Sequence, residues 1–115
     1  MESHSTILDR YMDGFRTGDH AAILSCLTDD VVWHIHGVRT TDGKDEFVAE
    51  VANPAFEGLP ELTVHRTIHA DDVVVVTGSG KGRLWDGGPF EFEFNDIFTF
   101  RDGLIAQLDS YLVQV

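Results

Sequence analysis

The sequence predicts an α+β domain in which three helices precede a mainly antiparallel sheet. Over residues 7–15 the apolar side chains recur at steps of three and four, which is typical of a helix that buries one face. From residue 61 to the end, β-branched and aromatic side chains alternate with polar ones between short turns, which is typical of strands. Since 115 residues suit one such domain, we predict a single domain over residues 1–115.

Helix-ending and helix-capping residues delimit the three predicted helices. The first helix carries the apolar positions just described, and Ser3, Ser5 or Thr6 is suited to cap its start. It ends at Gly18, which suits a left-handed conformation. Asp19 caps a second, short helix over residues 20–27. The third helix covers residues 44–53 and ends before Pro54, because proline cannot continue a helix.

One strand is predicted between the second and third helices, and four more complete the chain. Residues 31–36, VVWHIH, are rich in β-branched and aromatic side chains, whereas residues 37–43 are predicted as a polar loop. We expect the four later strands to form an antiparallel meander that curves around the helices and encloses a pocket. Tight turns with Gly or Asp separate these strands, which cover residues 61–69, 73–85, 89–100 and 104–115.

The charge and cysteine content exclude several classes of partner. The net charge of −12 repels phosphate backbones and anionic lipid headgroups, so we expect neither nucleic acid nor a membrane as a partner. Cys26 is the single cysteine and cannot form an internal disulfide, which suits a reducing compartment. The first residues lack the pattern of a secretory signal, and we therefore expect a cytoplasmic protein.

The segment PFEFEFNDIFTF, residues 89–100, places a carboxylate among phenylalanines. Side chains alternate between the two faces of a strand, so Asp96 shares a face with Phe94 and Phe98. An unpaired buried carboxylate costs several kcal/mol or loses its charge. Either Asp96 has hydrogen-bonding partners in a structural role, or its perturbed chemistry serves a function.

Several phrases of the sequence resemble the nuclear transport factor 2-like superfamily. They are LDRYMDGFRTGD, LTDDVVWHIHG, GKDEFVAEV and DIFTFRDGLIAQLDSYL, and together they span nearly the whole chain. The second and third are particularly similar to SnoaL-like proteins, which are relatives of small polyketide cyclases. The resemblance implies a cone-shaped, cystatin-like roll around an apolar cavity, and a homodimer. This fold serves isomerases, cyclases and dehydratases as well as non-catalytic binding domains.

Comparison with the ketosteroid isomerases of this superfamily implies candidate catalytic residues. Aligned by the phrases RYMDGFRTGD and NDIFTF, Tyr11 and Asp96 fall on the two oxyanion-hole positions, where a neutral acid and a phenol would donate to an enolate oxygen. The aspartate base of those enzymes corresponds to Ile35, which cannot move a proton. The flanking His34 and His36 are candidate substitutes, although alternation turns them to the opposite face unless a bulge or strand end intervenes.

An apolar wall would hold the body of the ligand on the face that carries Asp96. The candidate lining residues are Phe15, Trp33, Ile35, Phe47, Phe94, Phe98, Leu108 and Leu112. We therefore predict an enzyme that acts by proton transfer on a small hydrophobic carbonyl compound, of the isomerase, cyclase or dehydratase type. The alternative is a non-catalytic binder of a small apolar ligand, or a dimeric interaction module.

A metal site is a competing interpretation of the histidines. The HIH motif at residues 34–36 puts two imidazoles on one face of its strand, and His65 and His69 share a face of the predicted strand 61–69. The opposite face of that strand carries Arg66 with Ile68. Because two residues seldom fix a metal, we predict no metal and no organic cofactor.

Overall fold

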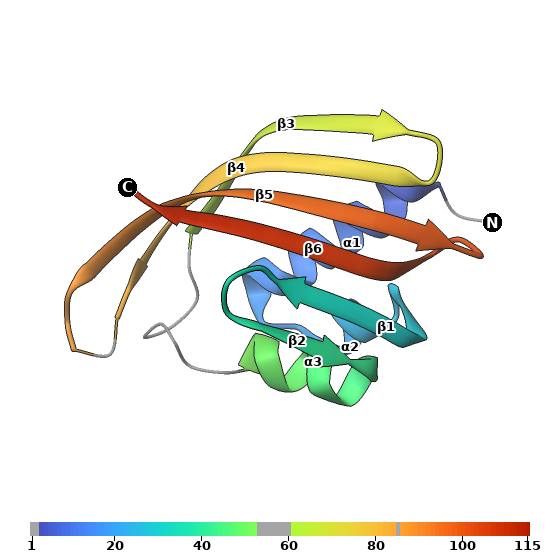
Figure 1. The fold of residues 1–115 in the computed structure, drawn as a ribbon, viewed down its shortest axis with the longest axis horizontal. Coiled ribbons are helices and arrows are strands. Elements are labelled where there is room, and N and C mark those ends of the chain that lie inside the picture. The colour runs from blue at the N-terminus through green and yellow to red at the C-terminus, as the bar shows by residue number, and fades with distance from the viewer. Residues whose placement is uncertain (1–2, 53–60, 85) are drawn as a thin grey trace.

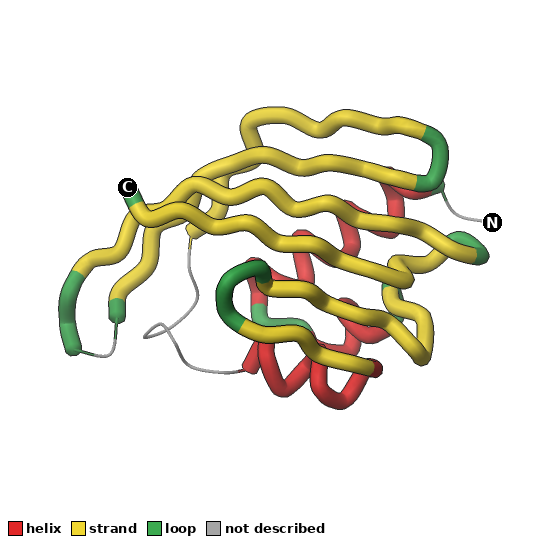
Figure 2. Tube along the Cα trace, viewed as in Figure 1, coloured by secondary structure: helices red, strands yellow, loops and turns green. Residues whose placement is uncertain are grey.

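The fold consists of three helices packed on one face of a curved sheet. A computed structural model describes residues 3–52, 61–84 and 86–115. Within these residues the sheet is a continuous, mixed layer of six strands, and the helices lie behind it (Figure 1). The tube view shows the same two layers, with the helices in red against the yellow strands (Figure 2). The predicted α+β class and the cone-like curvature are therefore confirmed.

The helices begin and end at the capping residues expected from the sequence. Helix α1 spans His4–Thr17, with Ser3 accepting a hydrogen bond from the Thr6 amide. It ends at Gly18, whose φ of 73° is the left-handed conformation that glycine adopts without strain. Helix α2 spans His20–Leu24 and α3 spans Gly43–Ala52. The predicted end at Pro54 lies outside the described residues.

The strands lie in the order β2-β1-β6-β5-β4-β3. The last four strands of the chain pair as the predicted antiparallel meander, whereas β1 pairs with β6 in parallel. This one parallel pair joins the first half of the chain to its carboxyl end. The strands are β1 Leu27–Ile35, β2 Arg39–Asp42, β3 Glu61–Ala70, β4 Val73–Arg83, β5 Pro89–Arg101 and β6 Leu104–Gln114.

The region between α2 and α3 differs most from the prediction. Strand β1 begins at Leu27, four residues before the predicted strand 31–36, so α2 is correspondingly shorter than predicted. The predicted loop also contains β2, which pairs with β1 as an antiparallel hairpin. The segment RTTD of β2 has no apolar alternation, so only its pairing with β1 makes it a strand.

The sheet has an inner face, which the helices cover, and an outer face on the opposite side. Residues that are directly paired on neighbouring strands point to the same face of the sheet, so the strand pairing shows on which face each side chain lies. On the inner face Trp33 is paired with Leu108, and Leu108 with Phe98. On the outer face Asp109 is paired with both His34 and Ile97.

A β-bulge at His65 interrupts the alternation of side chains along β3, so even-numbered residues before and after it point to opposite faces of the sheet. The register shifts between Val64 and Arg66, so Val64 lies in an inner row whereas Arg66 lies in an outer row, opposite Thr77. The expectation that His65 and His69 share a face is therefore wrong. His65 bonds Ser79 on the outer face at 3.1 Å, and His69 is paired with inner-face Val74.

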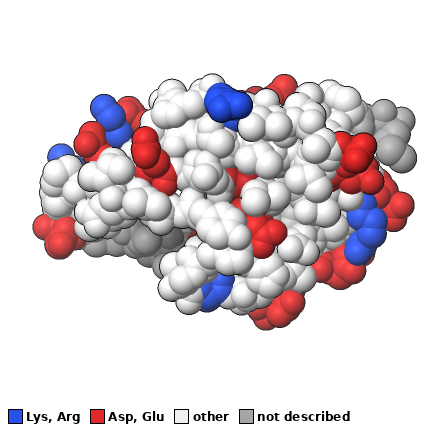
Figure 3. All heavy atoms as spheres, turned by 45° about the horizontal axis from the view of Figure 1, so that its top comes forward, with Lys and Arg blue, Asp and Glu red and all other residues white. Residues whose placement is uncertain are grey.

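The core lies between the inner face and the helices. It unites aliphatic side chains of α1 and α2 with the phenylalanine row of β5, and the single cysteine, Cys26, is buried in it. The outer face carries few charges across its middle, because most acidic and basic side chains gather towards its ends (Figure 3). No helix within the described residues is long and apolar enough to cross a membrane.

Candidate active site on the inner face

Asp96 stands on the inner face of β5, between Phe94 and Phe98. Its direct neighbours across the sheet are Val76 on β4 and Ser110 on β6. Atoms of the core desolvate its carboxyl group, yet part of its surface stays open. This burial raises the pKa of Asp96 from its ordinary 3.8 to about 6, although a hydrogen bond with Ser110 partly opposes the rise.

The protonation state of Asp96 at neutral pH differs from the sequence-based expectation. The pKa is raised, as predicted, but a pKa of about 6 leaves roughly nine tenths of the carboxyl groups ionised at pH 7. A group in this state accepts a proton more readily than it donates one. The electrostatics therefore favour Asp96 as a base over Asp96 as a permanent neutral acid.

Tyr11 on helix α1 lies close enough to Asp96 for the charge of that carboxyl group to act on its hydroxyl group. Its side chain is buried, with the ring edge-on to Phe98 and to Phe47 at centroid distances of 5.3 and 6.2 Å. Burial raises the pKa of Tyr11 well above its ordinary value, and the negative charge of Asp96 raises it further. The phenol therefore remains a neutral donor at physiological pH, within electrostatic reach of the carboxylate. The structure thus brings these two predicted residues together.

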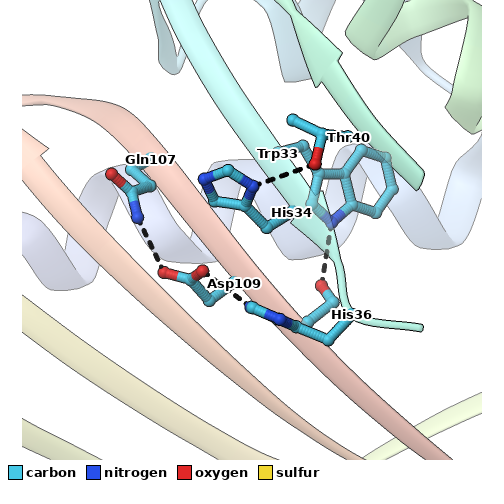
Figure 4. A network of polar contacts seen from close by, with 7 residues as sticks. Trp33, His34, His36, Thr40, Gln107 and Asp109 are labelled. Atoms are coloured by element: carbon cyan, nitrogen blue, oxygen red, sulfur yellow. Dashed lines mark hydrogen bonds and ion pairs between the residues drawn. The ribbon is translucent and has the colours of Figure 1, made fainter. Parts of the chain in front are cut away.

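Trp33 and Ser110 extend this arrangement to a hydrogen-bonded group on three strands. The indole Nε1 of Trp33 donates to Ser110 Oγ at 2.9 Å, as the dashed line from the Trp33 ring indicates in Figure 4. Ser110 in turn contacts the carboxyl group of Asp96. On its other side the Trp33 ring stacks on Phe47, with the centroids 4.6 Å apart.

His34 and His36 lie on the outer face, as strict alternation predicts for this strand. The Nδ1 atom of His34 is 3.0 Å from Thr40 Oγ1. The Nε2 atom of His36 is 2.9 Å from Asp109, which also accepts a hydrogen bond from Gln107 (Figure 4). The register shift of β1 against β6 lies between Leu27 and Val32, and the pairing is regular from Val32 to Ile35. Neither imidazole is therefore turned inward, and the sheet separates both histidines from Asp96.

The family model for the SnoaL-like domain matches residues 8–108 of this sequence. The match covers most of the chain, including Tyr11, Asp96 and the strands between them. The chain belongs to the SnoaL-like domain family. No curated protein matches it significantly.

Solved structures share the fold of this SnoaL-like domain at low sequence identity. An NTF2-like protein of unknown function from Burkholderia pseudomallei has a TM-score of 0.90 and 19% identity, over 98% of this chain and 92% of that one. TerC, co-crystallised with polyporic acid, has a TM-score of 0.85 and 23% identity, over 96% of this chain and 91% of that one. A provisionally named polyketide cyclase from Xanthomonas campestris has a TM-score of 0.84 and 19% identity, over 94% of this chain and 88% of that one. Such identities establish the fold alone.

The predicted ligand-binding residues of the domain divide by their exposure. Phe47, Phe98 and Leu108 have no exposed surface at all, so in this structure they act as packing residues. The others keep some surface and are able to contact a ligand. Trp33 and Phe94 are buried but not completely, Phe15 and Ile35 are partly buried against the core, and Leu112 is half exposed at the open end of the same face.

An enclosed apolar pocket beside Asp96 remains a prediction. One hollow among the described residues, of about 330 Å³, lies over strands β3 to β6. Its lining includes His65, Glu93, Asn95 and Tyr111, which belong to the outer face. Its mixed polar and apolar lining does not match the predicted apolar site.

The two histidine pairs that motivated the metal interpretation lie far apart in the sheet. His34 and His36 belong to the region of β1, and His65 and His69 to β3, with β6, β5 and β4 between the two strands. Among residues 3–52, 61–84 and 86–115, no group of three His, Cys, Asp or Glu side chains could hold a metal ion.

Ser110 is the site residue that sequence reasoning did not single out. The sequence places it on the same face as Leu108 and Leu112, where a lone hydroxyl among leucines is an available signal. Its pairing with Asp96 could not be predicted from the sequence, because the pairing depends on the register between β5 and β6. The fixed hydrogen bond with Trp33 likewise depends on the parallel pairing of β1 and β6.

Proposed function

We propose that this SnoaL-like domain is an enzyme that transfers a proton within a small hydrophobic carbonyl compound. The observation that carries the proposal is a carboxyl group with a pKa of about 6, set among phenylalanines and facing a permanently neutral phenol. The reaction is an isomerisation, an aldol-type cyclisation or a dehydration, since all three begin by removing a proton next to a carbonyl group.

Asp96 is the base in this mechanism. Its ionised carboxylate takes the proton from the carbon next to the carbonyl, and the electron pair of that C–H bond moves into the enolate. The protonated Asp96 then returns the proton to another carbon or to a leaving oxygen. A pKa of about 6 suits both steps near neutral pH, because the group is mostly ionised but not too weak a base.

Tyr11 is the donor to the developing enolate oxygen. Its raised pKa keeps the hydroxyl protonated, and its buried position on α1 keeps bulk water from competing for the oxygen. This assignment retains Tyr11 in the role implied by the family resemblance. It moves Asp96 from the role of donor to that of base, which supplies the function missing at Ile35.

The proposed ligand is small and largely apolar. Trp33, Phe94 and Ile35 surround the carboxyl group with apolar surface, which suits a ligand whose body is uncharged. The provisional polyketide cyclase name of the Xanthomonas campestris neighbour is in accord with a carbonyl-bearing substrate. No cofactor takes part in the proposed steps.

A direct test is the exchange of α-protons of enolisable ketones with deuterium from solvent. We expect wild type to catalyse the exchange and Asp96→Asn to lose about a hundredfold or more of the rate. Glu91→Gln is the matched control, because Glu91 is an exposed carboxylate on the outer face of the same strand. Equal rates for wild type, Asp96→Asn and Tyr11→Phe would remove the proposal.

A non-catalytic binder of a small apolar ligand is the second candidate. The isoleucine at position 35 favours it, because the related isomerases carry their aspartate base at the corresponding position and an isoleucine cannot move a proton. Mass spectrometry of the natively purified protein distinguishes the two functions. A retained ligand that is unchanged after incubation would support the binder, whereas its conversion to an isomer or a dehydrated product would support the enzyme.

We also propose that the outer face binds a second copy of the chain. Ile68, Val75 and Ile97 form one cross-strand row there, and Ile68 and the nearby Tyr111 are both more than 40% exposed. The middle of this face carries few charges although the chain has a net charge of −12 (Figure 3). Sedimentation of wild type as a dimer and of Ile68→Glu as a monomer would support the interface. A monomeric wild type at micromolar concentration would oppose it.

The proposed location of this enzyme is the cytoplasm. The thiol of Cys26 is buried beside the carbonyl oxygens of Ile7 and Ala22, an arrangement compatible with a reducing compartment. Fractionation of the source cells, with detection of the native protein, tests the location. Recovery mainly outside the cytoplasmic fraction would contradict it.

A further inference from the structure

The hydrogen-bond donors around Asp96 have a fixed direction. The indole N–H of Trp33 can only donate, so Ser110 Oγ accepts at this 2.9 Å contact. A serine hydroxyl carries a single hydrogen, which remains available for another acceptor. The residue opposite Ser110 on the inner face is Asp96, whose carboxylate can only accept when ionised. Ser110 therefore accepts from Trp33 and keeps a hydrogen that it is able to donate to Asp96, its direct neighbour across the sheet.

The neighbours of Asp96 leave Ser110 as its hydrogen-bonding partner across the sheet. On β4 the paired residue is Val76, and on β1 the residue opposite Ser110 is Ile35, so both offer only apolar side chains. The titratable group that faces Asp96 is Tyr11 on α1, which stays neutral and raises no competing charge. Ser110 contributes an interaction that stabilises the ionised carboxyl group and opposes the effect of burial.

We propose that Ser110, held by the indole of Trp33, is a positioning residue that binds one carboxylate oxygen of Asp96 and leaves the other oxygen free for the ligand. A hydroxyl that can rotate would bind the carboxylate only part of the time, whereas the Trp33 contact removes this freedom. Ser110 thereby keeps Asp96 ionised, as a base must be. This inference rests on the proposed function, but its structural part is testable without a substrate.

The first test is an NMR titration of the Asp96 carboxyl carbon in three proteins. Ser110→Ala should raise the midpoint by about one pH unit, the shift that corresponds to one lost hydrogen bond to a charged oxygen. Ser110→Thr keeps the hydroxyl and should titrate like wild type. An unchanged or lower midpoint in Ser110→Ala, or a threonine variant that titrates like the alanine variant, would overturn the proposal.

A second measurement reports on the Trp33 contact. The indole N–H signal of Trp33 should move with the same midpoint as Asp96 in wild type, because the two groups share Ser110, and this movement should disappear in Ser110→Ala. Trp33→Phe assigns the signal. An indole signal indifferent to the titration of Asp96 would overturn the proposed order of donation.

The kinetic outcome separates this inference from the proposed function. If wild type exchanges α-protons, the acidic limb of its pH profile should move upward by about one pH unit in Ser110→Ala and stay in place in Ser110→Thr. If wild type exchanges none while the titrations shift as expected, the proposed function fails and the role of Ser110 stands. An active wild type whose acidic limb is unmoved in Ser110→Ala contradicts the role of Ser110 alone.

Discussion

Asp96 and Asp109 are carboxylates on neighbouring strands of one sheet, but they face opposite sides. Asp109, on the outer face of β6, lies 2.9 Å from His36 and accepts a hydrogen bond from Gln107 at 2.9 Å. Asp96, on the inner face of β5, has Ser110 and apolar neighbours, and its pKa rises to about 6. The difference teaches that partners and desolvation, more than residue type, decide which acid becomes a base in the catalytic range.

The two faces also separate the histidines from the proposed chemistry. A histidine beside an aspartate is the more familiar proton-transfer pair, and the outer face contains one in His36 and Asp109. The inner face instead pairs an aspartate with a tyrosine, surrounded by phenylalanine rings. The proposed site is therefore the pair that is buried, Asp96 with Tyr11, and not the more exposed pair of His36 and Asp109.

The largest expected effect is the pH dependence of α-proton exchange. Below pH 6 the rate of wild type should fall about tenfold per pH unit, because protonated Asp96 cannot accept a proton. Between pH 7 and pH 4 the total loss is about a hundredfold. The rates are measured by proton NMR in deuterated buffers. A profile that is flat across this range would assign the base role to another group.

An effect of comparable size is expected on the pH dependence of stability. The folded state binds the proton of Asp96 more tightly than the unfolded chain does, since its pKa is about 6 instead of 3.8. This group therefore lowers the free energy of unfolding as the pH rises from about 4 to 6, by up to about 3 kcal/mol. Asp96→Asn removes the charged form and should be the more stable protein above pH 6.

Urea unfolding at several pH values checks this prediction. The advantage of Asp96→Asn over wild type should vanish near pH 4, where the folded wild type is already protonated. Asp109→Asn is the control from the outer face, and we expect it to lack this gain. An Asp96→Asn protein less stable than wild type at pH 8 would show that the carboxylate is well stabilised.

The third effect concerns Tyr11, whose hydroxyl group contributes one hydrogen bond to the proposed enolate. Tyr11→Phe keeps the ring contacts with Phe98 and Phe47, so the protein should fold normally. We expect a loss of about tenfold in kcat with little change in KM, since one hydrogen bond to a charged oxygen contributes about 1.5 kcal/mol. A loss confined to KM would indicate that Tyr11 binds the ground state of the substrate.

The smallest effect is expected for the outer-face pair. His36→Ala removes a partly exposed contact with Asp109 and the stacking of His36 on Tyr111, at a cost of about 1 kcal/mol in the free energy of unfolding. The NMR titration of Asp96 should be unchanged, because the sheet lies between the two sites. A shift of the Asp96 midpoint in this variant would show that the two faces are electrically coupled.

The sequence alone determined the facing of the important side chains. Alternation along β5 predicts that Asp96 shares a face with the phenylalanines, and alternation along β1 predicts that His34 opposes Trp33. Both assignments depend only on the geometry of a single strand, so no tertiary information is needed. The helix starts and ends at Ser3, Gly18 and Asp19 are equally local, because capping involves neighbouring residues.

Only the tertiary structure decided which residues stand opposite one another. The partnership of Asp96 with Ser110, the parallel pairing of β1 with β6, and the strand β2 all depend on register between segments that are distant in sequence. The bulge at His65, which turns Arg66 to the outer face, is likewise a property of the β3–β4 pair. The raised pKa of Asp96 is also a tertiary property, because it is caused by burial of the carboxyl group. The atoms that exclude water from this group come from several elements, and only the folded chain brings them together.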